Sequence, residues 1–470
     1  MKRHTLSLLL LVVSLVLPPV SFSQAVGTRA VWLTTLMGLD WPRQRAKNAD
    51  GIARQKAELT AIYDKLQAAG INTILFQARI RGTVAYPSDI EPFDAVFSGT
   101  AGRSPGYDPL QFALDEAHRR GMTFQAWVVA FPVNKAESVK ALGSRALPRQ
   151  RPELCQRCGE QYMMDPGVPG TAEYIASICR EIVERYAVDG IHLDYIRYPE
   201  TQVGFNDTQT YRRYGNGQAK ADWRRDNVTR TVRAIRQAID GVRSGVKLSC
   251  SPVGKYADLP RQSSKGWNAR DAVSQDAVMW LNEGLMDEIY PMMYFDGEHF
   301  YPFALDWQEK VQRGKVIPGL GIYFLSKSEK DWDLLRIQRQ LNFLKQQNFD
   351  GFALFRSKFF TDNTKGLYDW LATQYDRDDV AAIGESMAYG NKPAPKRRKR
   401  ITSADTLRVP EGMQVDVKRL ELTDAYGRLV GVKNADETAV FYNLPAGTYT
   451  LYGVTGKGAR HRLTTLHKTR

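Results

Sequence analysis

The fold is decided by the stretch Val188-Asp189-Gly190-Ile191-His192-Leu193-Asp194-Tyr195-Ile196-Arg197-Tyr198-Pro199, which begins as an apolar strand and ends in charged and aromatic side chains. Alternate residues of a strand face the same way, so Gly190, His192 and Asp194 share one face. A carboxylate that ends a buried parallel strand is costly unless it is paired or used. Active sites of (β/α)₈ barrels form at the carboxyl ends of the strands. Asp194 is therefore predicted to be catalytic; the alternative is a structural carboxylate that caps a neighbouring loop.

Strand and helix patterns alternate through most of the chain, which is typical of an α/β sheet. Eight strands are predicted, at residues 29–35, 71–79, 123–129, 188–194, 247–252, 287–294, 315–321 and 351–356. Helices are predicted at residues 52–69, 109–120, 171–186, 219–242, 272–283 and 332–347, with a last one that ends near Tyr375. Eight strands over about 350 residues fit a (β/α)₈ TIM barrel with long loops. We assign this barrel to residues 27–385.

The two ends of the chain have a different character. Lys2, Arg3 and His4 precede an apolar run at residues 6–17 and then Ser21-Phe22-Ser23, which is the pattern of a secretory signal peptide at residues 1–23. The run is too short for a spanning helix, although it would anchor the chain if cleavage failed. We expect an exported protein without a membrane span in its mature form, located in the periplasm, at the cell surface or outside the cell.

A basic, Pro-containing linker at residues 386–403 includes the run NKPAPKRRKR at 391–400. Beyond it, residues 404–470 alternate in short segments with Gly turns, which predicts a small β-sandwich tail. The run 391–400 contributes +6 and residues 401–470 a further +3 of the net charge of +14. Such a run is usually a solvated segment, and the alternative is adhesion to an anionic cell envelope. Nucleic-acid binding is not expected, because no basic-aromatic motif accompanies the run.

Several chemistries can be set aside on motif grounds. There is no Gly-rich phosphate loop, no Gly-x-Ser-x-Gly elbow and no HExxH pair. Cys155 and Cys158 have half the spacing of a zinc site without a second half, so a local disulfide or two free thiols in a loop are expected rather than metal. Cys179 and Cys250 are expected to be buried small apolar residues. We expect no metal and no cofactor.

Carboxylates, arginines and aromatic residues are left to carry the chemistry, and that composition suits a carbohydrate ligand. Aromatic residues gather in the segments that follow the predicted strands, where sugar rings could stack on them. They are Trp32, Trp41, Tyr86, Trp127, Tyr195, Tyr198, Trp267, Tyr294, Phe295, Tyr301, Trp307 and Tyr323. Each one alone is better explained by packing between barrel and helices; their concentration favours a binding site.

A family resemblance then follows from motifs that occur in order. GTRAVWLTT, NTILFQARIRGTVAYPSDIEP, GYDPLQFALDEAHRRGM, MMDPGVPGTAEYI and DGIHLDYIRYP resemble the successive motifs of glycosyl-hydrolase-like family 10 over about residues 27–375. The resemblance implies a TIM-barrel glycosidase of the bacterial cell envelope. It also implies activity on peptidoglycan glycan strands that lack stem peptides. Strand 188–194 resembles, more loosely, the DGxDxDxE motif of family 18 chitinases, and Tyr294 with Asp296 resembles their Met-x-Tyr-Asp.

The chain departs from these patterns where the second catalytic carboxylate would stand. The acid glutamate of the chitinases has no counterpart, because Ile196 and Arg197 occupy that region. Many members of family 10 read Asp-Asp-Tyr where this chain reads Asp194-Tyr195-Ile196. They also carry Pro-Gln where Pro291-Met292 stands here, and Asn-Pro-Tyr after the third strand. These departures leave the second carboxylate open and suggest a shifted substrate range.

A glycosidase needs one carboxylic acid to protonate the leaving oxygen and a second carboxylate as nucleophile or base. Asp194 is the first candidate and Asp296 the second, with a loop hydrogen-bond partner as the equal alternative for Asp296; Glu200, Asp40 and Glu288 are held in reserve. Gln77 and Arg79 are predicted to share one face of their strand, and His192 is either a residue that tunes Asp194 or a satisfied core histidine. The predicted substrate-binding residues are Trp32, Gln77, Arg79, Trp127, His192, Arg197, Tyr198 and Tyr294.

The tail carries a weaker resemblance of its own. VKRLELTDAYGRLV and LPAGTYTLYGVTGKGARHRLTTLHKTR are similar to a C-terminal sorting domain of the type IX secretion system, with an accessory or carbohydrate-contacting module as the alternative. We predict an exported glycoside hydrolase whose partners are a polysaccharide or peptidoglycan substrate and, through the tail, the secretion machinery. The competing hypotheses are a non-catalytic glycan-binding protein on a barrel scaffold and a structural envelope protein attached by its tail.

Overall fold

A computed structural model describes residues 27–200 and 203–375, together with the tail segments 400–401, 417–424, 429–434, 447–455 and 460–468. The predicted signal peptide and nearly all of the predicted linker lie outside the described residues. Within the described part of the chain, no helix combines the length and the apolar character needed to cross a membrane.

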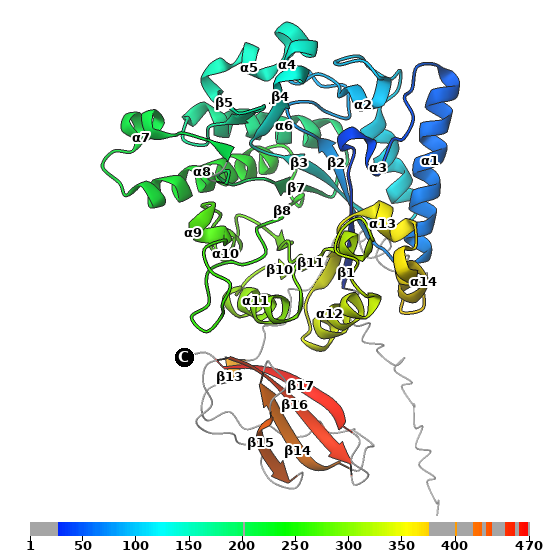
Figure 1. The fold of residues 1–470 in the computed structure, drawn as a ribbon, viewed down its shortest axis with the longest axis vertical. Coiled ribbons are helices and arrows are strands. Elements are labelled where there is room, and N and C mark those ends of the chain that lie inside the picture. Colours follow the sequence, from blue (N-terminus) through cyan, green and yellow to red (C-terminus); the bar gives the residue numbers. More distant parts are fainter. Residues whose placement is uncertain are drawn as a thin grey trace, which may run out of the picture.

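Parallel strands form the central sheet, in the order β10-β9-β8-β7-β3-β2-β1-β12-β11 (Figure 1). The strands are β1 (Thr28–Leu33), β2 (Thr73–Arg79), β3 (Thr123–Val129), β7 (Gly190–Asp194), β8 (Lys247–Cys250), β9 (Glu288–Ile289), β10 (Lys315–Val316), β11 (Gly319–Leu320) and β12 (Gly351–Leu354). All eight predicted strands are present, since β10 and β11 are two parts of the seventh.

The seventh strand is interrupted at Pro318, which has no N–H to donate to a ladder. Before the proline, β10 pairs with β9; after it, β11 pairs with β12, and Gly319 also bridges to Met292. One stretch of chain thus joins both ends of the sheet. The sheet closes on itself, and the predicted (β/α)₈ barrel is confirmed.

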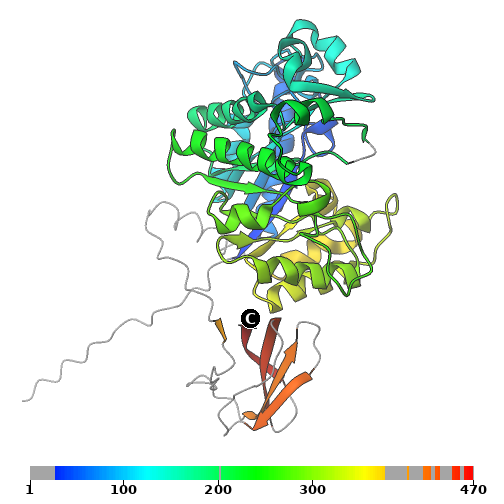
Figure 2. The same cartoon turned by 90° about the vertical axis from the view of Figure 1, so that its left-hand side faces the viewer.

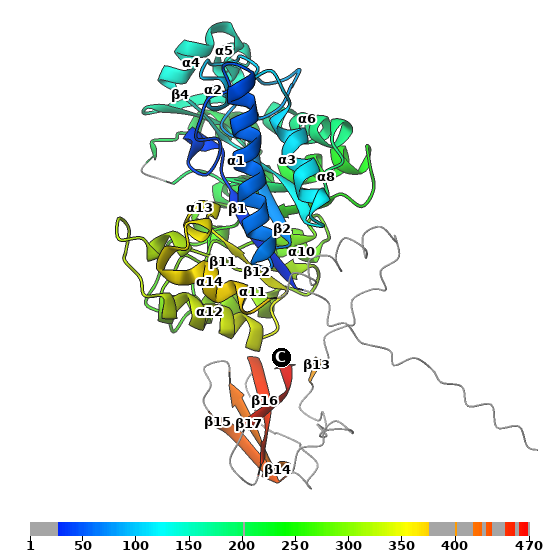
Figure 3. The same cartoon turned by 90° about the vertical axis from the view of Figure 1, so that its right-hand side faces the viewer.

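Helices cover the outside of the barrel (Figures 1 and 3). The main ones are α1 (Ala49–Ala68), α3 (Pro109–Arg119), α6 (Pro169–Arg185), α8 (Lys220–Asp240), α10 (Ala277–Asn282), α11 (Gly297–Lys310), α12 (Leu334–Gln346) and α14 (Leu367–Ala372), with short helices α2 (Ala95–Ser98), α7 (Thr208–Tyr214), α9 (Ala269–Ala272) and α13 (Ser357–Thr361) in the connections. Side chains of Asn48, Asp108, Asp276 and Asp333 accept backbone N–H groups at the starts of α1, α3, α10 and α12.

Two helices differ from the sequence prediction. The helix expected at residues 272–283 is shortened to α10, and its expected first residue ends the short helix α9, with Ser274 between the two at a φ of +61°. Helix α11 was not predicted, because Gly297 at its start and Pro302 inside it both weaken a helical pattern. Its place between β9 and β10 is the one that the barrel topology requires.

A small antiparallel sheet follows β3 and was also missed. It consists of β4 (Pro132–Lys135), β6 (Gln161–Met164) and β5 (Cys155–Cys158), and the helices α4 (Ala136–Leu142) and α5 (Leu147–Gln150) lie between its first two strands in sequence. The Cys155–Cys158 segment is therefore a strand and not a loop. All four cysteines are free thiols, so of the two expected states the pair adopts the unbridged one.

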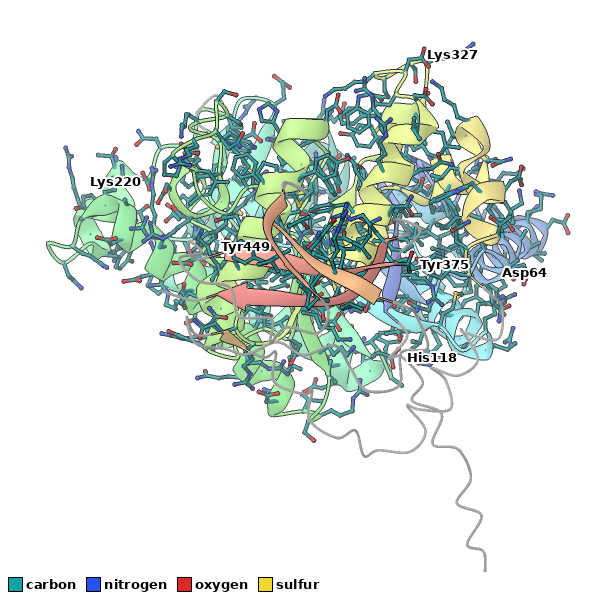
Figure 4. All side chains as sticks on the ribbon, turned by 90° about the horizontal axis from the view of Figure 1, so that it is seen from below. Asp64, His118, Lys220, Lys327, Tyr375 and Tyr449 are labelled. Atoms are coloured by element: carbon teal, nitrogen blue, oxygen red, sulfur yellow. The ribbon has the colours of Figure 1, made fainter. Side chains whose placement is uncertain are left out.

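The described tail residues form one five-stranded sheet, in the order β13 (Arg400–Ile401), β17 (Arg460–Lys468), β16 (Gly447–Thr455), β14 (Val417–Asp424) and β15 (Leu429–Asn434). The tail is β-structured as predicted; its described strands form one sheet, and the second layer that the predicted β-sandwich requires is not among the described residues. The sheet lies beside the helices α11 and α12 on the outside of the barrel (Figures 2 and 4). Thr448 of β16 donates to Oε1 of Glu309 of α11 at 3.3 Å.

Candidate active site

Asp194 is the last residue of β7 and lies at the carboxyl end of the barrel. Its Oδ1 accepts the backbone N–H of Tyr195 at 2.8 Å, and its Oδ2 accepts the indole N–H of Trp127 of β3 at 3.2 Å. The Ser251 hydroxyl is a third partner. Burial raises the pKa of Asp194, and these donors together with the nearby Arg197 only partly oppose that effect. The carboxyl group is thus held in place and biased towards its protonated form.

His192 lies one inward-facing position before Asp194 and is fully buried. Its Nε2 accepts the indole N–H of Trp32 at 3.1 Å, so the ring proton must be on Nδ1, which donates to Ser249 Oγ at 2.8 Å. Burial lowers the pKa of His192 to about 3, which makes it a neutral imidazole. Ser251 Oγ is also 3.1 Å from Nε2. Because Trp32 already donates to that nitrogen, the Ser251 hydroxyl proton is available to Asp194.

The chain of hydrogen bonds continues to the opposite end of the barrel. Ser249 Oγ donates to Gln125 Oε1 at 2.6 Å, and Gln125 Nε2 donates to Glu288 Oε2 at 2.9 Å. Gly190 leaves room for this chain, because a Cβ there would lie 3.2 Å from Gln125 Cγ. The interior of the barrel is thus filled by a polar column that ends at Asp194.

Glu288, a reserve candidate for catalysis, forms the end of this column that is farthest from Asp194. Burial alone would raise its pKa, but Lys247, 2.7 Å away, Lys315 and the hydroxyl of Tyr290 lower the pKa to about 2. It is an ionised, paired carboxylate at the amino ends of the strands. Stability roles are typical of that end of a barrel.

Arg197 lies between two aromatic rings beside Asp194. Its Cζ is 4.8 Å from the ring centroid of Tyr195 and 5.6 Å from that of Trp267. Glu200 is 3.6 Å from its Nη2. Tyr195 has a φ of +51°, rare for a tyrosine, and this conformation turns the chain sharply after Asp194. Tyr195, Arg197 and Glu200 therefore gather at the strand end that carries Asp194.

Tyr294 also belongs to this group. It is half-buried and stacks on Phe355 with ring centroids 5.3 Å apart. Burial raises its pKa, and the charge of Asp194 raises it further. The predicted residues Trp127, Arg197 and Tyr294 are thus brought together around Asp194. Tyr195 and Trp267, which the sequence marked only as aromatic residues that follow strands, complete the group together with Ser251, which the sequence did not single out.

The two remaining acidic candidates have other partners. Asp296 stands just before α11, with about half of its side chain exposed, and forms an ion pair with Arg336 of α12. Asp40 is buried, forms an ion pair with Arg356 and accepts the backbone N–H of Thr34 at 3.0 Å. Burial raises the pKa of Asp40 despite these partners.

Gln77 and Arg79 do not share a face, which corrects the sequence expectation. The pairing of β2 with β3 shifts register between these two residues, so the simple alternation fails there. Gln77 faces the loop after β1, and its Oε1 accepts the N–H groups of Thr35 and Leu36 at 2.9 and 2.8 Å. Gln77 thus fixes the first strand-to-helix loop.

Arg79 is completely buried and forms a two-point ion pair with Glu91, at 2.8 Å from Nε and 2.7 Å from Nη2. Its Nη1 donates to the carbonyl oxygens of Val129 and Ala130. A guanidinium with this many protein partners positions the end of β3 and is not available to a substrate.

Tyr198 and Trp32 are corrected in the same way. The Tyr198 hydroxyl accepts from Asn227 of α8 at 3.1 Å, and the ring lies against Arg224 and Phe205. Trp32 is 1% exposed and contacts His192, Tyr290 and Phe355 inside the barrel. Both side chains are buried. Tyr198 packs against α8 outside the strands, and Trp32 packs inside the barrel beside His192.

In the described part of the chain, no three His, Cys, Asp or Glu side chains cluster closely enough to hold a metal ion. A closed barrel with a buried carboxyl group among aromatic residues at the carboxyl ends of its strands is the arrangement expected of a glycosidase. The comparisons agree. Residues 27–330 match the family described as Glycosyl hydrolase-like 10, and the chain belongs to that family.

Two relatives cover most of the chain. Glycosyl hydrolase DigH from Escherichia coli K12 is 34% identical over 344 residues, covering 67% of this chain and 78% of its own. Glycosyl hydrolase YngK from Bacillus subtilis is 28% identical over 465 residues, covering 94% and 85%. Among solved structures, the PgaB (BpsB) glycoside hydrolase domain from Bordetella bronchiseptica aligns with 74% of this chain and 99% of that chain, at 13% identity and a TM-score of 0.47. The family match and the two relatives show that the protein is a glycoside hydrolase.

Proposed function

We propose that the protein is exported and cleaves glycosidic bonds of a cell-envelope polysaccharide, with peptide-free peptidoglycan glycan strands as the substrate. The proposal draws its substrate from the family resemblance and its export from the signal-like segment at residues 1–23. The sorting-domain resemblance of the tail gives the route to the cell surface. The observation that carries the chemistry is Asp194, a buried carboxyl group with a raised pKa at the mouth of the barrel.

A raised pKa suits a proton donor, because the group must still carry its proton near neutral pH. Asp194 is placed for this role, with Trp127, Tyr195 and Ser251 fixing its two oxygens. Glycoside hydrolysis then needs a second carboxylate to act as nucleophile or base. Two residues compete for it: Glu200, which lies beside Arg197 close to Asp194, and Asp296, which stands at the start of α11.

The test is hydrolysis of purified peptide-free glycan strands, intact peptidoglycan and chitin oligosaccharides by the full chain, measured as new reducing ends. Asp194→Asn should remove at least about 99% of turnover, since an amide cannot donate the proton. Asp306→Asn is the matched control. Asp306 is equally buried and its pKa is also raised by burial, but its partner is Lys310 on α11. The Asp306→Asn variant should keep wild-type hydrolytic activity.

Two outcomes would contradict the proposal. Near-wild-type turnover by a folded Asp194→Asn variant would show that Asp194 is not catalytic. Tight binding of glycans by the wild-type chain without hydrolysis of any of them would favour the non-catalytic glycan-binding alternative. The second carboxylate is identified by Glu200→Gln and Asp296→Asn. Added azide should restore activity only to the variant that lacks the nucleophile or base.

A further inference from the structure

Large exposed apolar side chains gather at one end of the barrel. In the described residues they are Met37, Leu39, Tyr195, Trp267 and Leu335. Met37 and Leu39 follow β1, Tyr195 follows β7, Trp267 follows β8, and Leu335 is the second residue of α12. All of these positions are strand-to-helix connections or helix starts, which lie at the carboxyl ends of barrel strands. The exposed apolar surface therefore belongs to the face that carries Asp194.

Two of these side chains, Tyr195 and Trp267, are aromatic and share one support. The Arg197 guanidinium contacts both rings and is itself only 6% exposed, whereas Tyr195 and Trp267 are 37% and 39% exposed. The rings thus rest on a buried cation, while more than a third of each aromatic residue is exposed to solvent. A cation beside an aromatic ring stabilises its placement.

The backbone on both sides is fixed as well. The N–H of Tyr195 donates to Asp194, so the backbone that carries the first ring is fixed beside the carboxyl group proposed to be catalytic. Trp267 precedes Asn268, whose side chain caps α9 and donates to Asp258 at 3.1 Å. Two loops that are about 70 residues apart in sequence therefore present a preformed pair of rings, and a preformed site binds with a smaller ordering cost.

We propose that Tyr195 and Trp267 form a sugar-binding subsite, in which the exposed rings contact the C–H faces of a pyranose ring next to the bond that is cleaved. This inference rests on the proposed function, because the occupant is a neighbouring residue of the same glycan strand. Arg197 acts as a positioning residue that holds the two rings. The subsite predicts that affinity increases with strand length, since a short oligosaccharide cannot fill it and the cleavage site together.

The test measures binding of length-fractionated, peptide-free glycan strands to the full chain carrying Asp194→Asn, which does not consume them. Adding Trp267→Ala should weaken binding of strands of about eight sugars roughly tenfold, as for an aromatic hot spot. Binding of disaccharides should change less than about twofold. Trp267→Phe should restore most of the affinity. The matched control is Tyr214→Ala on α7, a tyrosine with the Arg213 guanidinium 5.2 Å from its ring centroid, which should bind like the parent.

The outcomes separate the two proposals. Unchanged long-strand affinity in both Trp267→Ala and Tyr195→Ala, with folding verified by near-ultraviolet circular dichroism, would overturn the subsite and leave the proposed function standing. A loss that is equal for disaccharides and long strands would also overturn it, because that result means a disturbed cleavage site. If the wild-type chain neither binds nor hydrolyses any of the strands, the proposed function fails and the subsite fails with it.

Discussion

Trp127→Phe isolates one hydrogen bond of Asp194, the carboxyl group that we propose to be catalytic. The substitution keeps an aromatic ring in β3 and removes the indole N–H that Asp194 Oδ2 accepts at 3.2 Å. A hydrogen bond to a charged group is worth about 1.5–3 kcal/mol net. Because 3.2 Å is long for such a bond, we take the lower end. The ratio of protonated to ionised Asp194 should then rise about tenfold at a given pH.

The direction of the pKa change follows from the negative charge of Asp194, which the indole N–H stabilises. Loss of the donor disfavours the carboxylate, so the pKa of Asp194, already raised by burial, rises further. If Asp194 is the proton donor, it is the alkaline limb of the kcat/KM profile that moves to higher pH. If Asp194 instead reacts as a carboxylate, the acidic limb moves to higher pH. The limb that moves therefore assigns its role.

The assay is kcat/KM against pH for wild type, Trp127→Phe and Trp280→Phe. Trp280 of α10 is the matched control, because it is fully buried and its indole N–H donates to Thr229 Oγ1 at 2.8 Å, not to Asp194 or to a partner of Asp194. Loss of that N–H should leave both limbs in place. The reasoning would be refuted if a folded Trp127→Phe enzyme kept both limbs at their wild-type positions, or if Trp280→Phe moved them equally.

Three further outcomes are expected. Arg79→Met should lower the free energy of unfolding by about 3–5 kcal/mol in urea titrations, because it leaves Glu91 buried without its arginine partner. If the variant instead kept wild-type stability and lost glycan affinity, Arg79 would be a substrate-binding residue as the sequence predicted. The hydrogen bond to Asp189 raises the pKa of His118 in the folded protein. The stabilisation of the fold by this pair is therefore complete below the unfolded-state pKa of about 6.5, and it disappears as pH rises through the raised pKa of the folded state. The pair is partly exposed, so wild type and His118→Gln should differ by less than about 1 kcal/mol at pH 6 and not at all near pH 10, and a larger difference at the higher pH would show the sign to be wrong. Hydrolysis should survive a chelator, and loss that a divalent ion restores would contradict this.

Much of the architecture follows from local pattern. Capping residues such as Asp108 and the alternation in residues 188–194 placed the helices and strands, because both signals depend on neighbours within a few positions. The position of Asp194 at the end of β7 follows from the same alternation. Where the pattern was interrupted, as at Gly297 and Pro302 in α11, the prediction missed the element.

The surroundings of Asp194 were decided only by the tertiary structure. A register shift in β2 turned Arg79 away from the face of Gln77, and Arg336, 40 residues away in sequence, became the partner of Asp296. Trp267 came to share Arg197 with Tyr195 across two loops. Periodicity records which face a side chain occupies on its own element. It holds no information about which distant side chain meets it there, because that depends on how strands pair and loops close around a shared core.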